Sequence, residues 1–156
     1  MKTKAADPKP TARNRHVHAP LADDACPTCG TIMTEQRGKL RLPVNGEEIT
    51  VPSAAHLACP KCHEIVLRPQ DARRLSEDAI AIYRRKHGLL SGDQIRGIRE
   101  RHTLTQAQFA RLLRLGGNTL SRWESGRNVQ TEAMDTLLRL IRDMPGAIDY
   151  LRGHAA

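Results

Sequence analysis

The spacing of apolar residues changes along this chain from a period of two to a period of three and four. Apolar and polar residues alternate from Leu40 to Val44, and Ile49 and Val51 resume the alternation after Asn45-Gly46. An Asn-Gly pair between two alternating runs predicts a tight antiparallel hairpin. From residue 69 onward the helical period takes over. The pattern therefore predicts an α+β protein with two small domains, the first built on β-hairpins and the second all-α.

Two further strands are expected beside this hairpin. Thr31 to Gln36 can form one before it, and Ala54 to Ala58 can return the chain after it. The resulting module, residues 25–68, has too few apolar residues to fold unaided at roughly 43 residues. It therefore needs a covalent or metal link.

A helix is predicted from Pro69 to His87, and Gly88 closes it. Its apolar residues follow the helical spacing: Ala72, Leu75, Ala79, Ile82 and Tyr83. We expect this face to pack on its own domain rather than to form a dimer or partner surface. The basic end, Arg84 to His87, is expected to be a solvated last turn favoured by the helix dipole.

Residues 89–156 are predicted to form five helices. Capping boxes at Ser91/Gln94 and Thr105/Gln108 start two of them. Thr131 caps a helix that runs through Asp143, and Pro145 starts a final short helix. In the first helix Ile95 and Ile98 point inward, whereas Arg96, Arg99 and Arg101 are expected to lie mostly outward.

Leu104 to Gly126 reads as two short helices joined by a tight turn. The first is expected from Gln106 to near Arg114, and the second from about Asn118 to Glu124, with Leu115 buried in the turn. Leu120 and Trp123 then face inward, which leaves Asn118 and Arg122 together on the outer face. An Asn amide pairs bidentately with adenine and an Arg guanidinium with guanine, so this pair predicts base reading in the major groove of DNA.

This stretch resembles the helix-turn-helix of the phage Cro and repressor family, called Xre-like, in the residues TQxxFAxxLxxxxNTxSRWExG. The resemblance implies that Gln106 contacts a phosphate, Asn118 and Arg122 contact bases, and Thr119 and Arg127 contact flanking phosphates. Two residues depart from the family pattern. Arg114 stands where the family usually has the turn glycine, which predicts backbone strain. Gly117 stands where the family often has a Gln or Arg that contacts a base. Glu124 is interpreted as a structural hydrogen-bond acceptor.

The link for the β module is a set of four cysteines. Cys26-Pro-Thr-Cys29 and Cys59-Pro-Lys-Cys62 are two CPxC turns separated by 29 residues. Tetrahedral zinc takes four thiolates, and a CxxC turn presents two of them. Gly30 permits the left-handed conformation that follows such a turn, and His63 occupies the equivalent place in the second. The pattern predicts one structural zinc ion per chain, held by Cys26, Cys29, Cys59 and Cys62.

Other uses of these cysteines fit less well. Disulfides do not suit a cytoplasmic chain. A redox dithiol needs one CxxC in an α/β pattern, and a zinc deaminase needs an HxE element with an open coordination position. Iron in a rubredoxin-like site remains open, since the ligand set is the same. No free Cys and no Ser/His/Asp set remain, so we expect no enzyme activity.

The formal net charge of +8 suits a polyanionic partner. Aromatic residues make up only 3% of the chain, too few for a platform that stacks single-stranded bases, so duplex DNA is favoured. Residues 1–24 show no periodicity and are expected to be a disordered basic tail. No run of signal-peptide or membrane-span length is present, which predicts a cytoplasmic protein with no membrane contact.

The order of CPxCG and CPxCH pairs, helix 69–88 and the GGNTLSRWESG segment resembles the MqsA antitoxin family, also called YgiT-type zinc-finger proteins. The resemblance covers residues 26 to about 152. It implies a type II antitoxin whose zinc domain (25–68) neutralises a small ribonuclease toxin and whose helix-turn-helix domain (89–156) forms a homodimer that represses its operon by binding palindromic operator DNA. The alternatives are a stand-alone zinc-containing regulator and, less favoured, a metal-dependent or redox enzyme with a DNA-targeting module.

Overall fold

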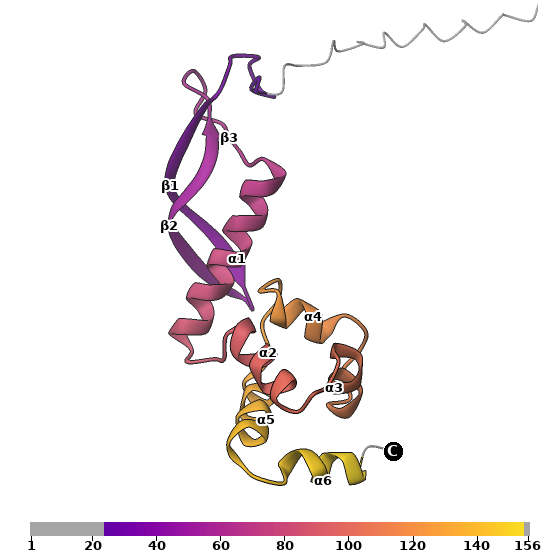
Figure 1. Cartoon of the computed structure of the whole chain (residues 1–156). Helices are drawn as coiled ribbons and strands as arrows, with labels where there is room; N and C mark the ends of the chain where they lie inside the picture. The colour runs from indigo at the N-terminus through magenta and orange to yellow at the C-terminus, as the bar shows by residue number, and fades with distance from the viewer. Residues whose placement is uncertain (1–23, 155–156) are drawn as a thin grey trace, which may run out of the picture.

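The computed structural model describes residues 24–154, which form a three-stranded sheet and six helices. An extended N-terminal half contains β1 (Thr34–Val44), β2 (Glu47–Ala58), β3 (Ile65–Val66) and α1 (Pro69–Lys86), and the remaining helices gather at one end of it (Figure 1). These are α2 (Gly92–Arg101), α3 (Gln106–Leu112), α4 (Thr119–Glu124), α5 (Glu132–Asp143) and α6 (Ala147–His154). The α+β class and the five-helix C-terminal half are confirmed. The predicted disordered tail lies outside the described residues, except for Asp24.

The β module is one long antiparallel hairpin rather than several. β1 and β2 pair from Thr34↔Ala58 to Val44↔Glu47, so both flanking strands predicted from sequence are continuous with the central pair. Asn45 and Gly46 have φ of 49° and 82°, the two left-handed residues of a type I′ turn. A bulge between Gly38 and Leu40 interrupts the register and leaves Lys39 without a partner in the ladder. β3 adds only two pairs to the far edge of β2.

Helix α1 lies along this hairpin and completes its core. The buried residues shared by the two elements are Val44, Ile49, Val51, Ala54, Leu75, Ala79 and Ile80. The expectation that the apolar face of this helix packs within its own domain is confirmed, although Ala72 is exposed and Ile80 takes its place in the core. The helix therefore supplies apolar surface that residues 25–68 lack by themselves.

The helical half packs around a separate cluster that includes Ile95, Phe109, Leu120, Trp123 and Leu138. Both predicted capping boxes are present, with the Ser91 and Thr105 hydroxyls each accepting from the amide three residues later. Thr131 caps α5 by accepting from the Met134 amide. These caps fix where the helices begin, as the sequence predicted.

The turn between α3 and α4 differs from the prediction in its details. Helix α3 ends at Leu112 rather than near Arg114, and α4 begins at Thr119, with Asn118 as its N-cap. Leu115 is half-buried rather than buried. Arg114 has φ of 54°, so a residue with a Cβ atom occupies the left-handed position where the helix-turn-helix pattern usually has glycine. The predicted strain at this residue is confirmed, because such a conformation costs an L-residue roughly 1 kcal/mol.

The two halves meet at the segment that follows α4. Val129 is buried in the core between α1 and the hairpin, far in sequence from the other residues of that cluster. Arg84 of α1 in turn contacts the helical half, where it donates to the backbone carbonyls of Trp123 and Asn128. The expectation of a solvated basic end is therefore wrong for Arg84, which is only 5% exposed.

Candidate metal centre and nucleic-acid interface

The four predicted ligand cysteines converge at the end of the hairpin that lies away from the helical half (Figure 1). Their sulfur atoms all lie within 4.8 Å of one another, with Cys26 and Cys62 3.5 Å apart and Cys29 and Cys59 3.4 Å apart. Ligands of a tetrahedral ion with Zn–S bonds of about 2.3 Å lie roughly 3.8 Å apart. The observed spacing therefore suits a single tetrahedral ion bound by all four sulfur atoms.

Each cysteine pair occupies a turn of the same construction. The Gly30 amide donates to the Cys26 carbonyl and the His63 amide to the Cys59 carbonyl, at 2.9 Å and 3.0 Å. Both residues are left-handed, with φ of 71° for Gly30 and 61° for His63. His63 thus adopts the glycine conformation that its position requires, which is the irregularity seen in the sequence.

The surroundings of the sulfur atoms favour thiolate at one position. Hydrogen bonds with the side chain and backbone of Thr31 lower the pKa of Cys29 to about 6. The Glu64 backbone lowers the pKa of Cys62, but burial and hydrogen bonds with the other three sulfur atoms raise it more, to about 12. A bound cation displaces such protons, because thiolate is the ligand form.

This centre also closes a small core of its own. Cys26 and Cys59 are fully buried with Met33 and Leu57, and Val66 packs against them. Arg68 anchors the start of the first turn by donating to Asp24 at 2.8 Å and to Glu35 at 3.2 Å. The donor set and its packing fit a structural metal ion, held by Cys26, Cys29, Cys59 and Cys62.

Helix α4 presents the predicted base-reading face to solvent. Leu120 and Trp123 are 1% and 4% exposed and face the core, whereas Asn118 and Arg122 are exposed on the opposite side. Gln106, Asn118 and Ser121 border one shallow hollow between the start of α3 and the start of α4. The structure therefore brings the first two predicted contact residues together at the N-terminal ends of both helices.

The remaining predicted contacts lie around this face. Thr119 is half-buried in the first turn of α4, and Arg127 is exposed in the loop after it, where its Nε donates to Ser125 Oγ at 3.0 Å. Gly126, at φ of 71°, ends α4 and turns the chain toward Arg127. Helices α3 and α4 lie at the opposite end of the molecule from the start of β1, which follows the first cysteine turn (Figure 1).

An ion pair between Arg99 and Glu124 joins α2 to α4. Arg99 of α2 donates to both carboxylate oxygens of Glu124, at 2.7 Å and 3.0 Å, and the two side chains are 11% and 1% exposed. Gln106 Nε2 donates to the same carboxylate at 2.8 Å. Although burial raises it, these hydrogen bonds lower the pKa of Glu124 below its ordinary value. The interpretation of Glu124 as a structural acceptor is confirmed.

The buried roles of Arg99 and Arg84 were not predicted from the sequence. Arg99 was expected outside with its neighbours, but it connects α2, α4 and the Leu104 carbonyl. The available signal was the acidic residue at the end of the motif, because a buried carboxylate needs a cationic partner. No comparable signal marked Arg84, whose partners are mostly backbone carbonyls.

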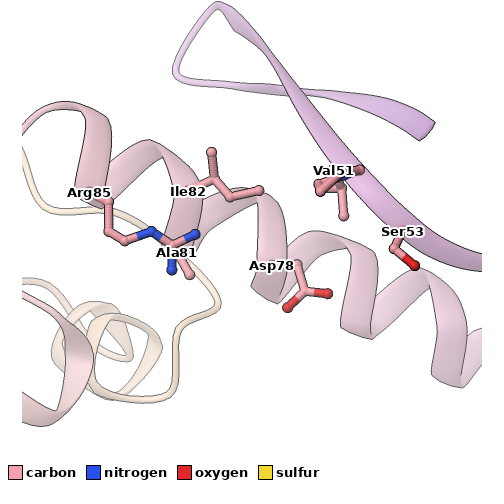
Figure 2. A pocket seen from close by; sticks show the side chains of 7 residues that line it. Val51, Ser53, Asp78, Ala81, Ile82 and Arg85 are labelled. Carbon is pink, nitrogen blue, oxygen red and sulfur yellow. The ribbon is translucent and has the colours of Figure 1, made fainter. Parts of the chain in front are cut away.

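A further hollow lies between β2 and α1 (Figure 2). Val51 and Ser53 of the strand face Asp78, Ala81, Ile82 and Arg85 of the helix. Its lining contains one acid and one hydroxyl but no histidine or second acid. It carries no acid–base or nucleophile–base set of the kind that enzymes use.

The molecule is thus a small two-part protein that joins a four-cysteine centre to a five-helix helix-turn-helix fold. Residues 21–152 match the family described as the antitoxin component of the bacterial toxin-antitoxin system, MqsA. The chain belongs to this family. Among residues 24–154 no helix combines the length and apolarity that crossing a membrane requires.

Two curated relatives are also antitoxins. Antitoxin HigA-2 of Vibrio cholerae is 37% identical over 62 residues, which cover 40% of this chain and 60% of that protein. Antitoxin PezA of Streptococcus pneumoniae is 43% identical over 47 residues, 30% of each chain. The chain thus spans less than two thirds of either relative.

Proposed function

We propose that this antitoxin forms a homodimer that represses its own operon and neutralises a small ribonuclease toxin. The proposal of DNA binding rests on one observation: Asn118 and Arg122 are exposed on α4, directly opposite the buried Leu120 and Trp123. With its inner side fixed in the core, α4 can offer only this outer side to the major groove. An Asn at the start of the helix and an Arg one turn later would read adenine and guanine.

The neighbouring groups serve to place the helix on the DNA backbone. Gln106 gives one N–H of its side-chain amide to Glu124 and keeps the second for a phosphate. Glu124 thereby orients the amide at the start of α3. Thr119 and Arg127, at the two ends of α4, are the proposed contacts to flanking phosphates.

Dimerisation is proposed through α5 and α6. Three of the large apolar side chains exposed in the described residues lie there: Leu140 at 44%, Met144 at 55% and Tyr150 at 66%. A second copy that covers this patch would hold two α4 helices for successive major grooves, about 34–36 Å apart. A palindromic operator follows from that twofold symmetry.

The cysteine centre is proposed to hold zinc, and the half that carries it is proposed to bind the toxin. Ile32 and Ile65, next to the two cysteine turns, are 59% and 47% exposed. Exposed aliphatic side chains beside a rigid metal centre suit a protein partner better than a small ligand. A structural zinc ion would supply thiolate coordination that orders both turns.

Titration of variants on a selected duplex tests the DNA half. A duplex is first selected from a random pool by the purified protein, and a scrambled duplex of the same composition is the control. Asn118→Ala and Arg122→Ala should each cost about 1–3 kcal/mol per half-site on the selected duplex, whereas Gln106→Ala should weaken both duplexes alike. Arg74→Ala, an exposed change on α1 that belongs to neither the proposed DNA face nor the proposed dimer face, is the matched control. Equal losses for all three contact variants would refute the assignment.

The toxin half is tested in cells. Expression of the reading frame adjacent to this one should arrest growth, and this protein should restore growth. An Ile32→Ser, Ile65→Ser double variant should lose that rescue while it keeps operator affinity. If no adjacent frame is toxic and the protein still represses its promoter, the stand-alone regulator is the correct function.

A further inference from the structure

The loop after the recognition helix is built into the N-terminal half of the molecule. Val129 is 7% exposed and lies in the core formed by α1 and the hairpin, and Gln130 is fully buried. Leu42 to Asn45 of the hairpin and Arg127 to Val129 border the same small hollow. Residues 123–130 therefore pack against both halves.

Arg84 holds this loop from α1. Its Nη2 atom lies 3.0 Å from the Trp123 carbonyl, 3.0 Å from the Asn128 carbonyl and 3.1 Å from Gln130 Oε1. One NH₂ group thus serves three acceptors, and its charge lies at the C-terminal end of α4, where free carbonyls favour a cation. Gln130 extends this hydrogen-bond network to the helical half, because its Nε2 donates to the Leu90 carbonyl and to Asp135 of α5.

A buried charge is costly unless its surroundings are organised around it, and removing it leaves buried acceptors unpaired. Arg84 has no acidic hydrogen-bond partner, and its Nε has no partner among the described residues. Stability alone is poorly served by such an arrangement. Its specific effect is to fix one end of α4 relative to α1.

We propose that Arg84 is a positioning residue for DNA reading: it holds the recognition helix in a set orientation on the hairpin–α1 body, so that the two halves move as one. The proposal rests on the proposed DNA-binding function. The C-terminal end of α4 is held from two sides, by Arg99 of α2 through Glu124 and by Arg84 of α1 through the Trp123 carbonyl, so the helix presents Asn118 and Arg122 at one angle. A freely jointed helical half would not keep its angle to the rest of the molecule.

Three variants isolate this role. Arg84→Met keeps the length of the side chain and removes every donor, Arg84→Lys keeps a charge with three N–H groups, and Arg85→Ala changes the exposed neighbour on the same turn. The probes are the selected duplex and the scrambled duplex, at a temperature where circular dichroism shows equal folded fractions. Arg84→Met should lower the ratio of selected to scrambled affinity about tenfold, the cost of one misplaced base contact. Arg84→Lys should recover part of it, and Arg85→Ala should leave it unchanged.

Backbone ¹⁵N relaxation of the zinc-loaded full chain supplies a second readout, and its measurement on the natural protein does not depend on a variant folding. The hairpin and α2–α6 should share one rotational correlation time in the natural protein and separate in Arg84→Met. Two correlation times in the natural protein, or an unchanged affinity ratio in Arg84→Met, would overturn the proposal. Loss of the proposed function itself has a different signature, because the natural protein would then prefer no duplex at all.

Discussion

Replacing Gly92 with alanine should separate the packing of α2 against α4 from ordinary helix propensity. Gly92 is the buried first residue of α2, and a Cβ there would lie 2.6 Å from the Glu124 carbonyl oxygen and 2.8 Å from that of Trp123. Both acceptors are backbone atoms at the C-terminal end of α4, so they cannot rotate away. Restoring an ordinary 3.4 Å contact requires α2 and α4 to separate by about 0.8 Å.

That separation should be costly. Overpacking of this kind costs about 1–3 kcal/mol, and the gain from alanine in a helix offsets less than about 1 kcal/mol of it. We therefore expect Gly92→Ala to destabilise the protein by about 1–2 kcal/mol, which lowers Tm by roughly 3–8 °C. The same displacement moves Asn118 and Arg122, so affinity for the selected duplex should fall as well.

Gly97 offers a matched control on the same helix. A Cβ at Gly97 meets nothing within 4 Å, so Gly97→Ala should gain roughly 0.5–1 kcal/mol from the smaller loss of backbone entropy. Thermal unfolding followed by circular dichroism, together with duplex titration, measures both variants. Changes in Tm of the same sign and size would refute the reasoning, because they would mean that the close approach of α2 to α4 has no energetic consequence.

Four further outcomes are expected. The pKa of Glu124 in the folded protein lies below its ordinary value of 4.5, so the ionised carboxylate contributes stability above pH 4.5 that is lost as the pH falls through the folded pKa. Acid unfolding should therefore be steeper in the natural protein than in Glu124→Gln. Arg99→Ala, which leaves that carboxylate buried and unpaired, should cost about 3–5 kcal/mol by urea unfolding. Chelation at neutral pH should raise amide exchange in residues 26–34 and 59–66 but not in α1, and full protection after chelation would rule out a structural metal. Arg114→Gly should stabilise the fold by up to about 1 kcal/mol because it relieves the left-handed φ of 54°, and a lower Tm would mean that the hydrogen bond to the His154 carbonyl outweighs the strain.

Local chemistry made much of the fold predictable. Asn45-Gly46 specifies a type I′ turn, and the boxes at Ser91 and Thr105 specify where helices begin, because each depends on residues within three positions. The four cysteines were predictable as a cluster for a similar reason. Two CPxC turns on either side of a hairpin have few ways to satisfy their thiols other than by meeting.

Burial of long charged side chains was not predictable in the same way. Arg84 is bonded to groups 39 to 46 residues further along the chain, and Arg99 to a carboxylate 25 residues away. A periodicity analysis assigns any arginine to the outer face of a helix. Only the tertiary structure shows that backbone carbonyls accept from Arg84 and that a buried carboxylate accepts from Arg99.

The burial of Val129 bears on how proteins of this architecture can be recombined. This side chain belongs by sequence to the helical half, yet it is buried in the cluster that contains Val44, Leu75 and Ile80 of the other half. A chimera joined within residues 87–90 to a foreign metal-binding module would place Val129 against a surface that lacks these complementary residues. Exchange of DNA specificity between such proteins should therefore succeed by substitution on α4 and fail by transplantation of the whole helical unit, unless the complementary residues of α1 and the hairpin travel with it.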